Sequence, residues 1–315
     1  MSAPLLVIAI GGNSLIRDST HMTVPDQYQA AGETSHHIAA VIKMGYRVLV
    51  THGNGPQVGF ILLRSELARD FLHSVPLEVC VADTQGAIGY QIAQTLGNEL
   101  RQLGIERAVA PVVTQVVVDT DDPAFQNPSK PIGPFMTEAD AKSHELEVGW
   151  HIREDAGRGW RRVVASPRPL EIVELPVIRE LLAQEFIVIA AGGGGIPVLR
   201  DATGALQGVP AVIDKDQTTS LLARELSADV FLISTGVERV ALHFRTPQEK
   251  WLERITLDEA IRYRDEGHFA PGSMLPKIDA AIDFLRGGGK HVIVTSPEKI
   301  EEALQGHTGT HIVPG

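Results

Sequence analysis

Long apolar runs, basic tracts and cysteine pairs are scarce in this chain of 315 residues. The start of the chain, Met1 to Pro4, leads directly into a short apolar segment. It has neither the basic region of an export signal nor the roughly 18 apolar residues of a membrane span. The net charge is −11, and no basic stripe is present that would neutralise nucleic acid or anionic lipid. We therefore expect neither a membrane nor a nucleic acid as partner.

Cysteine is almost absent, because Cys80 is the only one in the sequence. A single cysteine can form neither an internal disulfide nor a cysteine-rich metal site, which is typical of proteins in a reducing compartment. We expect a cytoplasmic protein, in which Cys80 is a small buried apolar residue.

Short segments rich in Val and Ile alternate with stretches of helical periodicity. The predicted strands are 5–10, 48–50, 108–118, 186–190, 230–233 and 292–294, and the predicted helices are 28–44, 84–103, 177–184, 218–226 and 277–285. This alternation predicts an α/β fold with a buried parallel sheet between helices. We interpret residues 1–315 as one domain.

Residues 119–169 break this pattern, because prolines, glycines and charges replace the apolar periodicity. A disordered linker is the simplest interpretation of such a composition. Phe125, Phe135, Trp150 and Trp160 could anchor a small packed unit instead, so we favour a protruding subdomain inserted into the domain.

Glycine-rich or small polar segments follow four of the predicted strands, at residues 11–14, 52–55, 192–195 and 234–236. Loops at the carboxyl ends of parallel strands gather along one edge of a sheet, where ligands bind, so the sequence predicts one shared cleft. Backbone N–H groups in such loops can approach an anion without a Cβ in the way. The four glycines at 192–195 match neither a P-loop nor a dinucleotide-binding fingerprint.

Charged residues in three places are candidates for contact with a phosphate. Asp214, Lys215 and Asp216 precede a predicted helix; Asp216 is interpreted either as a helix N-cap or as a carboxylate that orients cations or magnesium. Lys277 lies in the first turn of another predicted helix, where a cation is unfavourable unless an anion is also present. Lys130 is the third candidate, although such a lysine is exposed in most proteins. His52 is more typical of a hydrogen-bonded structural residue.

Phosphoryl transfer demands little covalent chemistry from a protein, which must align the reactants and neutralise charge on the transferred group. Three lysines, glycine-loop amides and a metal ion suffice for that. The sequence shows no Ser-His-Asp or Cys-His constellation and no zinc-binding histidine spacing.

Taken together, these segments resemble the carbamate kinase family of the amino-acid kinase superfamily, over essentially the whole chain. The resemblance is carried by residues 8–13, 51–59, 85–90, 122–125, 128–135, 161–167, 192–197, 212–216, 272–274 and 276–277. The wider superfamily commonly has a lysine just before the first glycines, where this chain has Ala9. Carbamate kinases use the lysine of the protruding subdomain instead, which matches Lys130.

This resemblance implies a three-layer αβα sandwich with a mainly parallel sheet of about eight strands, a protruding subdomain at 119–169, and a homodimer. It also implies reversible phosphoryl transfer between ATP and carbamate, with Mg²⁺ accompanying the nucleotide, as part of arginine and nitrogen metabolism. The amino half would hold the carbamoyl group and the carboxyl half the nucleotide.

The roles implied for individual residues fall into three groups. Lys130, Lys215 and Lys277 would bridge the transferred phosphoryl group, and Asp216 would orient lysines. Residues around the carbamoyl group would be Gly11, Gly12, Asn13, Gly53, Asn54 and Gly55. Residues at the nucleotide would be Asp214, Ser234, Thr235, Gly236, Val237, Phe269, Gly272 and Met274.

Two positions depart from the pattern of many family members, which have Leu-Thr-Asp-Val at 234–237 and Gly at 275. Here Gly236 removes a carboxylate near the expected nucleotide pocket, and Leu275 stiffens the loop before Lys277. Two alternatives therefore stay open. The chain could be a divergent kinase for another small carboxylate or carbamate analogue, or a nucleotide-binding regulatory protein without catalysis.

Overall fold

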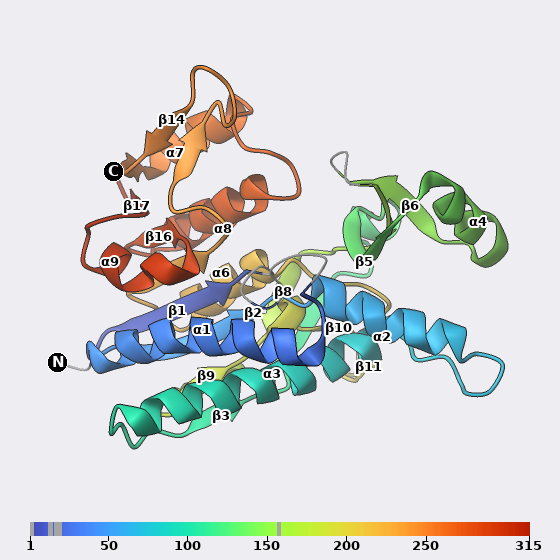
Figure 1. Ribbon diagram of the computed structural model, residues 1–315, viewed down its shortest axis with the longest axis horizontal. Helices are drawn as coiled ribbons and strands as arrows, with labels where there is room; N and C mark the ends of the chain where they lie inside the picture. Colours follow the sequence, from blue (N-terminus) through green and yellow to red (C-terminus); the bar gives the residue numbers. More distant parts are fainter. Residues whose placement is uncertain (1–2, 12–14, 16–20, 156–158) are drawn as a thin grey trace.

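The protein is built around an eight-stranded, mainly parallel sheet (Figure 1). The structure is a computed structural model that describes residues 3–11, 15, 21–155 and 159–315. Across the sheet the strands are β15 (Arg254–Thr256), β17 (Thr310–Val313), β16 (Val292–Thr295), β12 (Val230–Ser234), β1 (Leu5–Ile10), β2 (Arg47–His52), β9 (Ile187–Ile189) and β3 (Val109–Pro111). Neighbouring strands are parallel except β16 and β17. The predicted sheet is thus confirmed.

Helices cover both faces of this sheet and complete the three layers. One layer contains α1 (Val24–Lys43), α3 (Leu77–Gln102) and α9 (Ile300–Leu304); the other contains α5 (Leu175–Ala183), α6 (Lys215–Glu225), α7 (Leu257–Asp265) and α8 (Met274–Arg286). Alternate residues of β1 pack into the two cores: Val7 into the α5–α8 core and Ile8 into the α1–α3 core. Because successive strand side chains point to opposite faces, this central strand is apolar throughout.

The prediction of one strand over residues 108–118 is wrong. The segment forms two strands in different sheets, because the chain turns between Pro111 and Gln115. The second of them, β4 (Gln115–Val118), joins a four-stranded sheet of order β11-β10-β4-β8, with β11 (Leu206–Gly208), β10 (Ile196–Arg200) and β8 (Pro169–Ile172). The turn is fixed by Thr114, whose backbone N–H donates to the Gln85 side chain at 2.7 Å. That contact cannot be inferred from local periodicity.

The segment after β4 leaves the central sheet and forms a small unit of its own. It contains the 3₁₀ turn η2 (Pro123–Phe125) and a three-stranded antiparallel sheet of β5 (Lys130–Met136), β7 (Trp160–Val164) and β6 (His151–Glu154), with α4 (Glu138–Val148). Figure 1 shows β5, β6 and α4 standing away from the central sheet, on the side toward which α2 (Gly55–Leu67) extends. That residues 119–169 act as a subdomain stays a prediction.

Two further pieces complete the described chain. A hairpin of β13 (Val240–Leu242) and β14 (Lys250–Leu252) lies near the carboxyl end, and the short turns η3 (Gly192–Gly194) and η4 (Pro297–Lys299) follow β9 and β16.

Cys80 is fully buried in a third apolar cluster. Burial raises the pKa of its thiol to about 11, so Cys80 is not a nucleophile at neutral pH.

Candidate active site

Four adjacent strands bring the predicted glycine-rich loops to one edge of the sheet. The strands lie in the order β12-β1-β2-β9, and each ends in one of those loops. Backbone hydrogen bonds join them: the Gly53 N–H donates to the Ile10 carbonyl, and the Gly11 N–H donates to the Ser234 carbonyl, both at 3.1 Å. The predicted gathering of these loops is confirmed, whereas Gly12 and Asn13 lie outside the described residues.

The four-glycine segment owes its composition to contacts within the protein. A Cβ on Gly192 would lie 2.3 Å from His52 Nε2, and one on Gly193 would lie 2.1 Å from Asn54 Nδ2. A Cβ on Gly194 would clash with Ile213, and one on Gly195 would clash with Val116. Positive φ angles at residues 193–195 also favour glycine. The segment is therefore a junction in which the loop after β9 packs against the loop after β2.

A buried glutamine on α3 holds this glycine junction, defined here as residues 191–195. The Gln85 side-chain amide donates to the carbonyls of Gly192 (3.0 Å) and Thr114 (3.1 Å). Thr114 in turn accepts a hydrogen bond on Oγ1 from the Ala191 N–H at 2.9 Å. Ala191 has φ of 51°, a left-handed conformation that is costly for alanine, so these bonds stabilise a strained turn. In the sequence, Gln85 is part of the segment 85–90 that carries the family resemblance, but no role was predicted for it.

Three lysines and two aspartates form one charge cluster beside this junction. The ammonium of Lys215 lies 2.5 Å from Asp216 Oδ1, and that of Lys277 lies 2.9 Å from Asp216 Oδ2. Lys130 reaches Asp214 Oδ2 at 2.6 Å. The anion that a lysine at the start of α8 requires is thus the Asp216 carboxylate, which is 2% exposed. All five predicted charged residues lie together, although they come from three separate parts of the chain.

Local structure at the start of α6 explains how the two aspartates divide their tasks. Asp214 is the N-cap of α6, since its Oδ1 accepts from the N–H groups of Asp216 (2.9 Å) and Gln217 (3.3 Å). The interpretation of Asp216 as the N-cap is therefore wrong. Asp216 stands inside the first turn, where both of its oxygens are free to hold lysines.

The ionisation of the cluster follows from burial and from pairing. Burial opposes the charge on Asp216, but the ammonium groups of Lys215 and Lys277 outweigh it and hold the pKa of that carboxyl well below its ordinary value. Burial lowers the pKa of Lys215, and the attraction of Asp216 only partly offsets it. For Lys277, the attraction of Asp216 outweighs burial, so its pKa is raised. Three lysine side chains thus face two carboxylates, an arrangement that suits an anionic ligand.

His52 is a structural residue at the junction, consistent with the interpretation from sequence. It is 1% exposed, and its Nδ1 lies 3.0 Å from the Gly53 carbonyl. Burial, with the nearby charge of Lys215, lowers its pKa to about 4, so the ring is neutral at pH 7. Asn54 is also buried, and its side-chain amide donates to Thr84 Oγ1 at 2.9 Å. Gly55 begins α2 directly after this loop.

The predicted nucleotide residues are spread around the carboxyl half of the sheet edge. Ser234 ends β12, and the Thr235 N–H donates to the Thr295 carbonyl at 2.8 Å. Gly236 is exposed and Val237 half-buried, whereas Phe269 is buried in the core that contains Ile278 of α8. Gly272 has φ of 74° and Met274 begins α8, so both lie in the turn that leads to Lys277.

Of the buried hydroxyl groups at the ends of β12 and β16, Ser234 was predicted from the sequence, whereas Thr295 and Ser296 were missed. The side-chain oxygens of Ser234, Thr295 and Ser296 are buried and have no hydrogen-bond partner among the described residues. Ser234 and Thr295 are paired neighbours in the sheet. Buried hydroxyls are normally paired, so these three are candidates for contact with water or a ligand. For Thr295 and Ser296, the only available signal was their place beside the predicted residue Ser234, which the sheet pairing reveals.

The described residues contain neither a cluster of metal-ligating side chains nor a membrane-spanning helix. No group of three or more His, Cys, Asp or Glu side chains that could hold a metal ion is present in the described ranges. Nor does any helix within those ranges combine the length and apolar character needed to cross a bilayer.

Comparison with known proteins gives consistent results for sequence and fold. The model of the amino acid kinase family matches residues 4–296. The chain is 52% identical to the carbamate kinase-like protein YahI of Escherichia coli over 98% of both chains. It is 50% identical to the carbamate kinase of Thermococcus kodakarensis, also over 98% of both chains. The structure of Giardia lamblia carbamate kinase bound to AMP-PNP covers 99% of both chains, with a TM-score of 0.91 and 42% identity.

Proposed function

The chain belongs to the carbamate kinase branch of the amino acid kinase family, and on this premise we propose that it transfers a phosphoryl group reversibly between ATP and carbamate. In the direction of ATP synthesis, a β-phosphate oxygen of ADP attacks the phosphorus of carbamoyl phosphate in line. The bond from phosphorus to the carbamoyl oxygen breaks, and carbamate leaves with the bonding electrons. The observation that carries the proposal is the convergence of Lys130, Lys215 and Lys277 on two aspartates.

The charge cluster supplies what this reaction needs from the protein. Negative charge spreads over the equatorial oxygens of the transferred group, and preorganised cations stabilise that state more than they stabilise the reactants. Asp216 holds Lys215 and Lys277 at a fixed separation from each other, while Asp214 holds Lys130. Because the lysines are already positioned, little reorganisation is required when the phosphates arrive.

The remaining predicted residues are assigned on the same premise. Gly11, Gly12, Asn13, Gly53, Asn54 and Gly55 surround the carbamoyl group, and the glycine junction keeps the last three in register. Asp214, Ser234, Thr235, Gly236, Val237, Phe269, Gly272 and Met274 border the nucleotide. Residues 119–169 act as a subdomain whose task is to deliver Lys130.

We take Mg²⁺ to be part of the nucleotide substrate. Magnesium in kinases is commonly held by substrate phosphates with one or two carboxylates, and keeps several waters. Asp214 and Asp216 are the two carboxylates of the charge cluster, and each already holds at least one lysine. Such a donor set fits a metal ion that arrives with the phosphates and neutralises their charge.

The first test is ATP formation by the purified protein from ADP, magnesium and carbamoyl phosphate. Lys277→Ala should lower kcat by about a hundredfold, the scale of one preorganised charge-stabilising group. Lys290→Ala is the matched control, because Lys290 pairs with Asp229 on the surface and should leave turnover unchanged. Equal rates in wild type and Lys277→Ala would overturn the proposal.

A second candidate keeps the fold and the chemistry but changes the acceptor to another small carboxylate or carbamate analogue. It is favoured by Gly236 and Leu275 and by the buried hydroxyl of Ser234, which has no hydrogen-bond partner in the described part of the chain. A panel of such acceptors with ATP distinguishes it from carbamate. A catalytically silent nucleotide-binding protein is the third candidate, and three clustered cations argue against it.

We further propose a cytoplasmic homodimer, on the basis of the family resemblance and the single buried cysteine. Light scattering of the purified protein measures the assembly, and a monomer at micromolar concentration would contradict it.

A further inference from the structure

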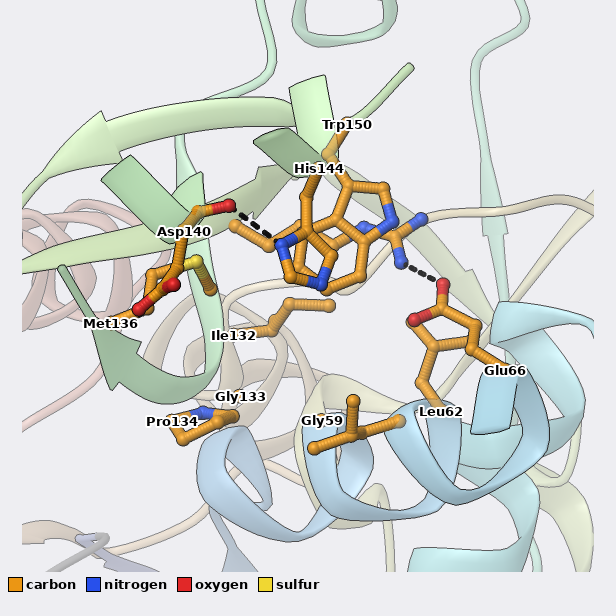
Figure 2. A pocket seen from close by; sticks show the side chains of 12 residues that line it. Gly59, Leu62, Glu66, Ile132, Gly133, Pro134, Met136, Asp140, His144 and Trp150 are labelled. Atoms are coloured by element: carbon orange, nitrogen blue, oxygen red, sulfur yellow. Dashed lines mark hydrogen bonds and ion pairs between the residues drawn. The ribbon is translucent and has the colours of Figure 1, made fainter. Parts of the chain in front are cut away.

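A pocket of about 220 Å³ lies between α2 and the three-stranded sheet that carries Lys130. Figure 2 shows Gly59 and Leu62 of α2 on one side, Ile132, Gly133 and Pro134 of β5 on the other, and His144 with Trp150 above them. The walls are mainly apolar, and the lining residues include Leu62, Leu63, Ile132, Pro134 and Met136. None of the roles assigned above involves this pocket.

The charged groups around the pocket are already paired. Glu66 and Arg162 lie 2.7 Å apart, and the Arg162 guanidinium stacks 4.7 Å from the centre of the Trp150 ring. The Asp140 carboxylate accepts a hydrogen bond from Thr137 Oγ1 at 2.7 Å. Because Glu66 and Arg162 neutralise each other and Asp140 is exposed to solvent, a neutral occupant suits the pocket.

One polar atom at the rim remains available. The His144 Nδ1 lies 2.7 Å from the Asp140 carbonyl, so in the neutral ring this nitrogen carries the hydrogen and donates it. Nε2 is then an acceptor, and no donor in the described part of the chain reaches it. The ring stacks on Trp150 with centroids 4.3 Å apart, which fixes its orientation.

We propose that this pocket binds a small, neutral aromatic molecule of one or two rings that carries a single N–H or O–H donor. The volume exceeds the roughly 150 Å³ of an apolar cavity that holds benzene. Apolar walls with few polar groups, located between two structural units, are typical of ligand sites. The thioether of Met136 and the edge of the stacked rings suit an aromatic partner.

The position of the pocket links it to the charge cluster. Helix α2 starts at Gly55, at the end of the loop with Gly53 and Asn54, and β5 starts at Lys130. Between them, Gly59 and Gly133 touch: a Cβ on Gly59 would lie 2.0 Å from the Gly133 Cα. An occupant in contact with both elements restrains β5 relative to α2, so that Lys130 is held at Asp214 and hindered from moving toward the phosphates. The bound molecule therefore lowers turnover, and this second part alone rests on the proposed function.

The test uses indole as the probe and benzofuran as its counterpart without a donor, titrated by calorimetry in the absence of nucleotide and carbamoyl phosphate. Indole should bind saturably and about fivefold more tightly than benzofuran, as one hydrogen bond predicts. His144→Phe should abolish that preference. Leu63→Trp fills the pocket from a half-buried position and should abolish binding. Leu67→Trp, one turn later and 75% exposed, is the matched control and should bind normally.

Each outcome decides one part of the proposal. Absence of saturable indole binding, or binding undiminished in Leu63→Trp, overturns the site. Binding without any decrease in kcat for ATP formation overturns the link to Lys130. If no phosphoryl transfer is detected at all, the titrations still decide whether the pocket binds, because they contain no substrate.

Discussion

The two sides of the charge cluster are held in different ways. Lys215, Asp216 and Lys277 stand on α6 and α8, which pack together in the main core. Lys130 instead begins a strand of the outer three-stranded sheet and is joined to the cluster by one ion pair with Asp214. The positions of Lys215 and Lys277 therefore depend on packing in the core. The position of Lys130 depends on the contact between α2 and β5 at Gly59 and Gly133, which is called the seam below. A single site can thus combine a fixed set of cations with one cation whose position is set by a different part of the fold.

The largest effect is expected from Asp216→Asn, which attacks the fixed side. Removing the carboxylate leaves Lys215 and Lys277 buried without an anion, and breaking a buried ion pair costs about 3–5 kcal/mol of folding free energy. We expect kcat for ATP formation to fall by about a hundredfold or more, because both lysines lose their positions. Urea unfolding and initial rates measure the two effects. Glu302→Gln removes an exposed partner of Lys299 and should change neither.

Acid should weaken the glycine junction beside the cluster through His52. Its pKa is about 4 in the folded protein, below the ordinary 6.5, so the unfolded chain binds more protons between these values. The contribution of neutral His52 to the free energy of unfolding is fully present above pH 6.5. It is lost as the pH falls toward 4, by about 2 kcal/mol between pH 6.5 and 5. Urea unfolding at several pH values should give a shallower dependence for His52→Gln. An unchanged slope would contradict the role of His52, and His307→Gln, at an exposed histidine, is the control.

Gly59→Ala tests the seam. The new methyl group would clash with the backbone of Gly133, so β5 must move, and a displacement of about 1 Å at a catalytic group can cost up to a hundredfold in rate. We expect kcat to fall about tenfold while the core stays folded. Gly32→Ala is the control, because no atom lies near that position in α1, and it should stabilise the helix by about 0.5–1 kcal/mol. Wild-type turnover in Gly59→Ala would show that β5 does not set the position of Lys130.

Gln85→Leu gives the smallest expected loss in rate and tests the glycine junction. It leaves the Thr114 N–H without its partner and removes one of the two hydrogen bonds that the Gly192 carbonyl accepts, so the loop shifts against His52 and Asn54. We expect kcat to fall severalfold and KM for carbamoyl phosphate to rise, while KM for ADP is unchanged. Gln91→Leu on the same helix is the matched control: Gln91 is also buried, but its side-chain oxygen has no hydrogen-bond partner among the residues that the structure describes. An equal rise in KM for carbamoyl phosphate and for ADP would indicate a general structural role of Gln85 instead.

Much of the architecture could be predicted from the sequence because its causes are local. Apolar runs such as 5–10 bury both faces of a parallel strand, and glycines after them mark the functional edge. The Asp214-Lys215-Asp216 segment was recognisable because charges between apolar flanks must be paired. The segment 108–118 was misread because local signals were followed there too. Its apolar residues are continuous, but a contact with Gln85 of α3 turns the chain at Thr114.

The amino-acid sequence alone determined the family, the sheet and the residue types of the charge cluster. Only the tertiary structure decided which partner each charge takes, since Lys130 and Asp214 are 84 residues apart and Lys277 and Asp216 are 61 apart. It also decided that the four glycines accommodate His52 and Asn54, and that a pocket opens between α2 and β5. The physical reason is that periodicity and propensity act within a few residues, whereas contact, burial and charge pairing depend on the packing of the whole chain.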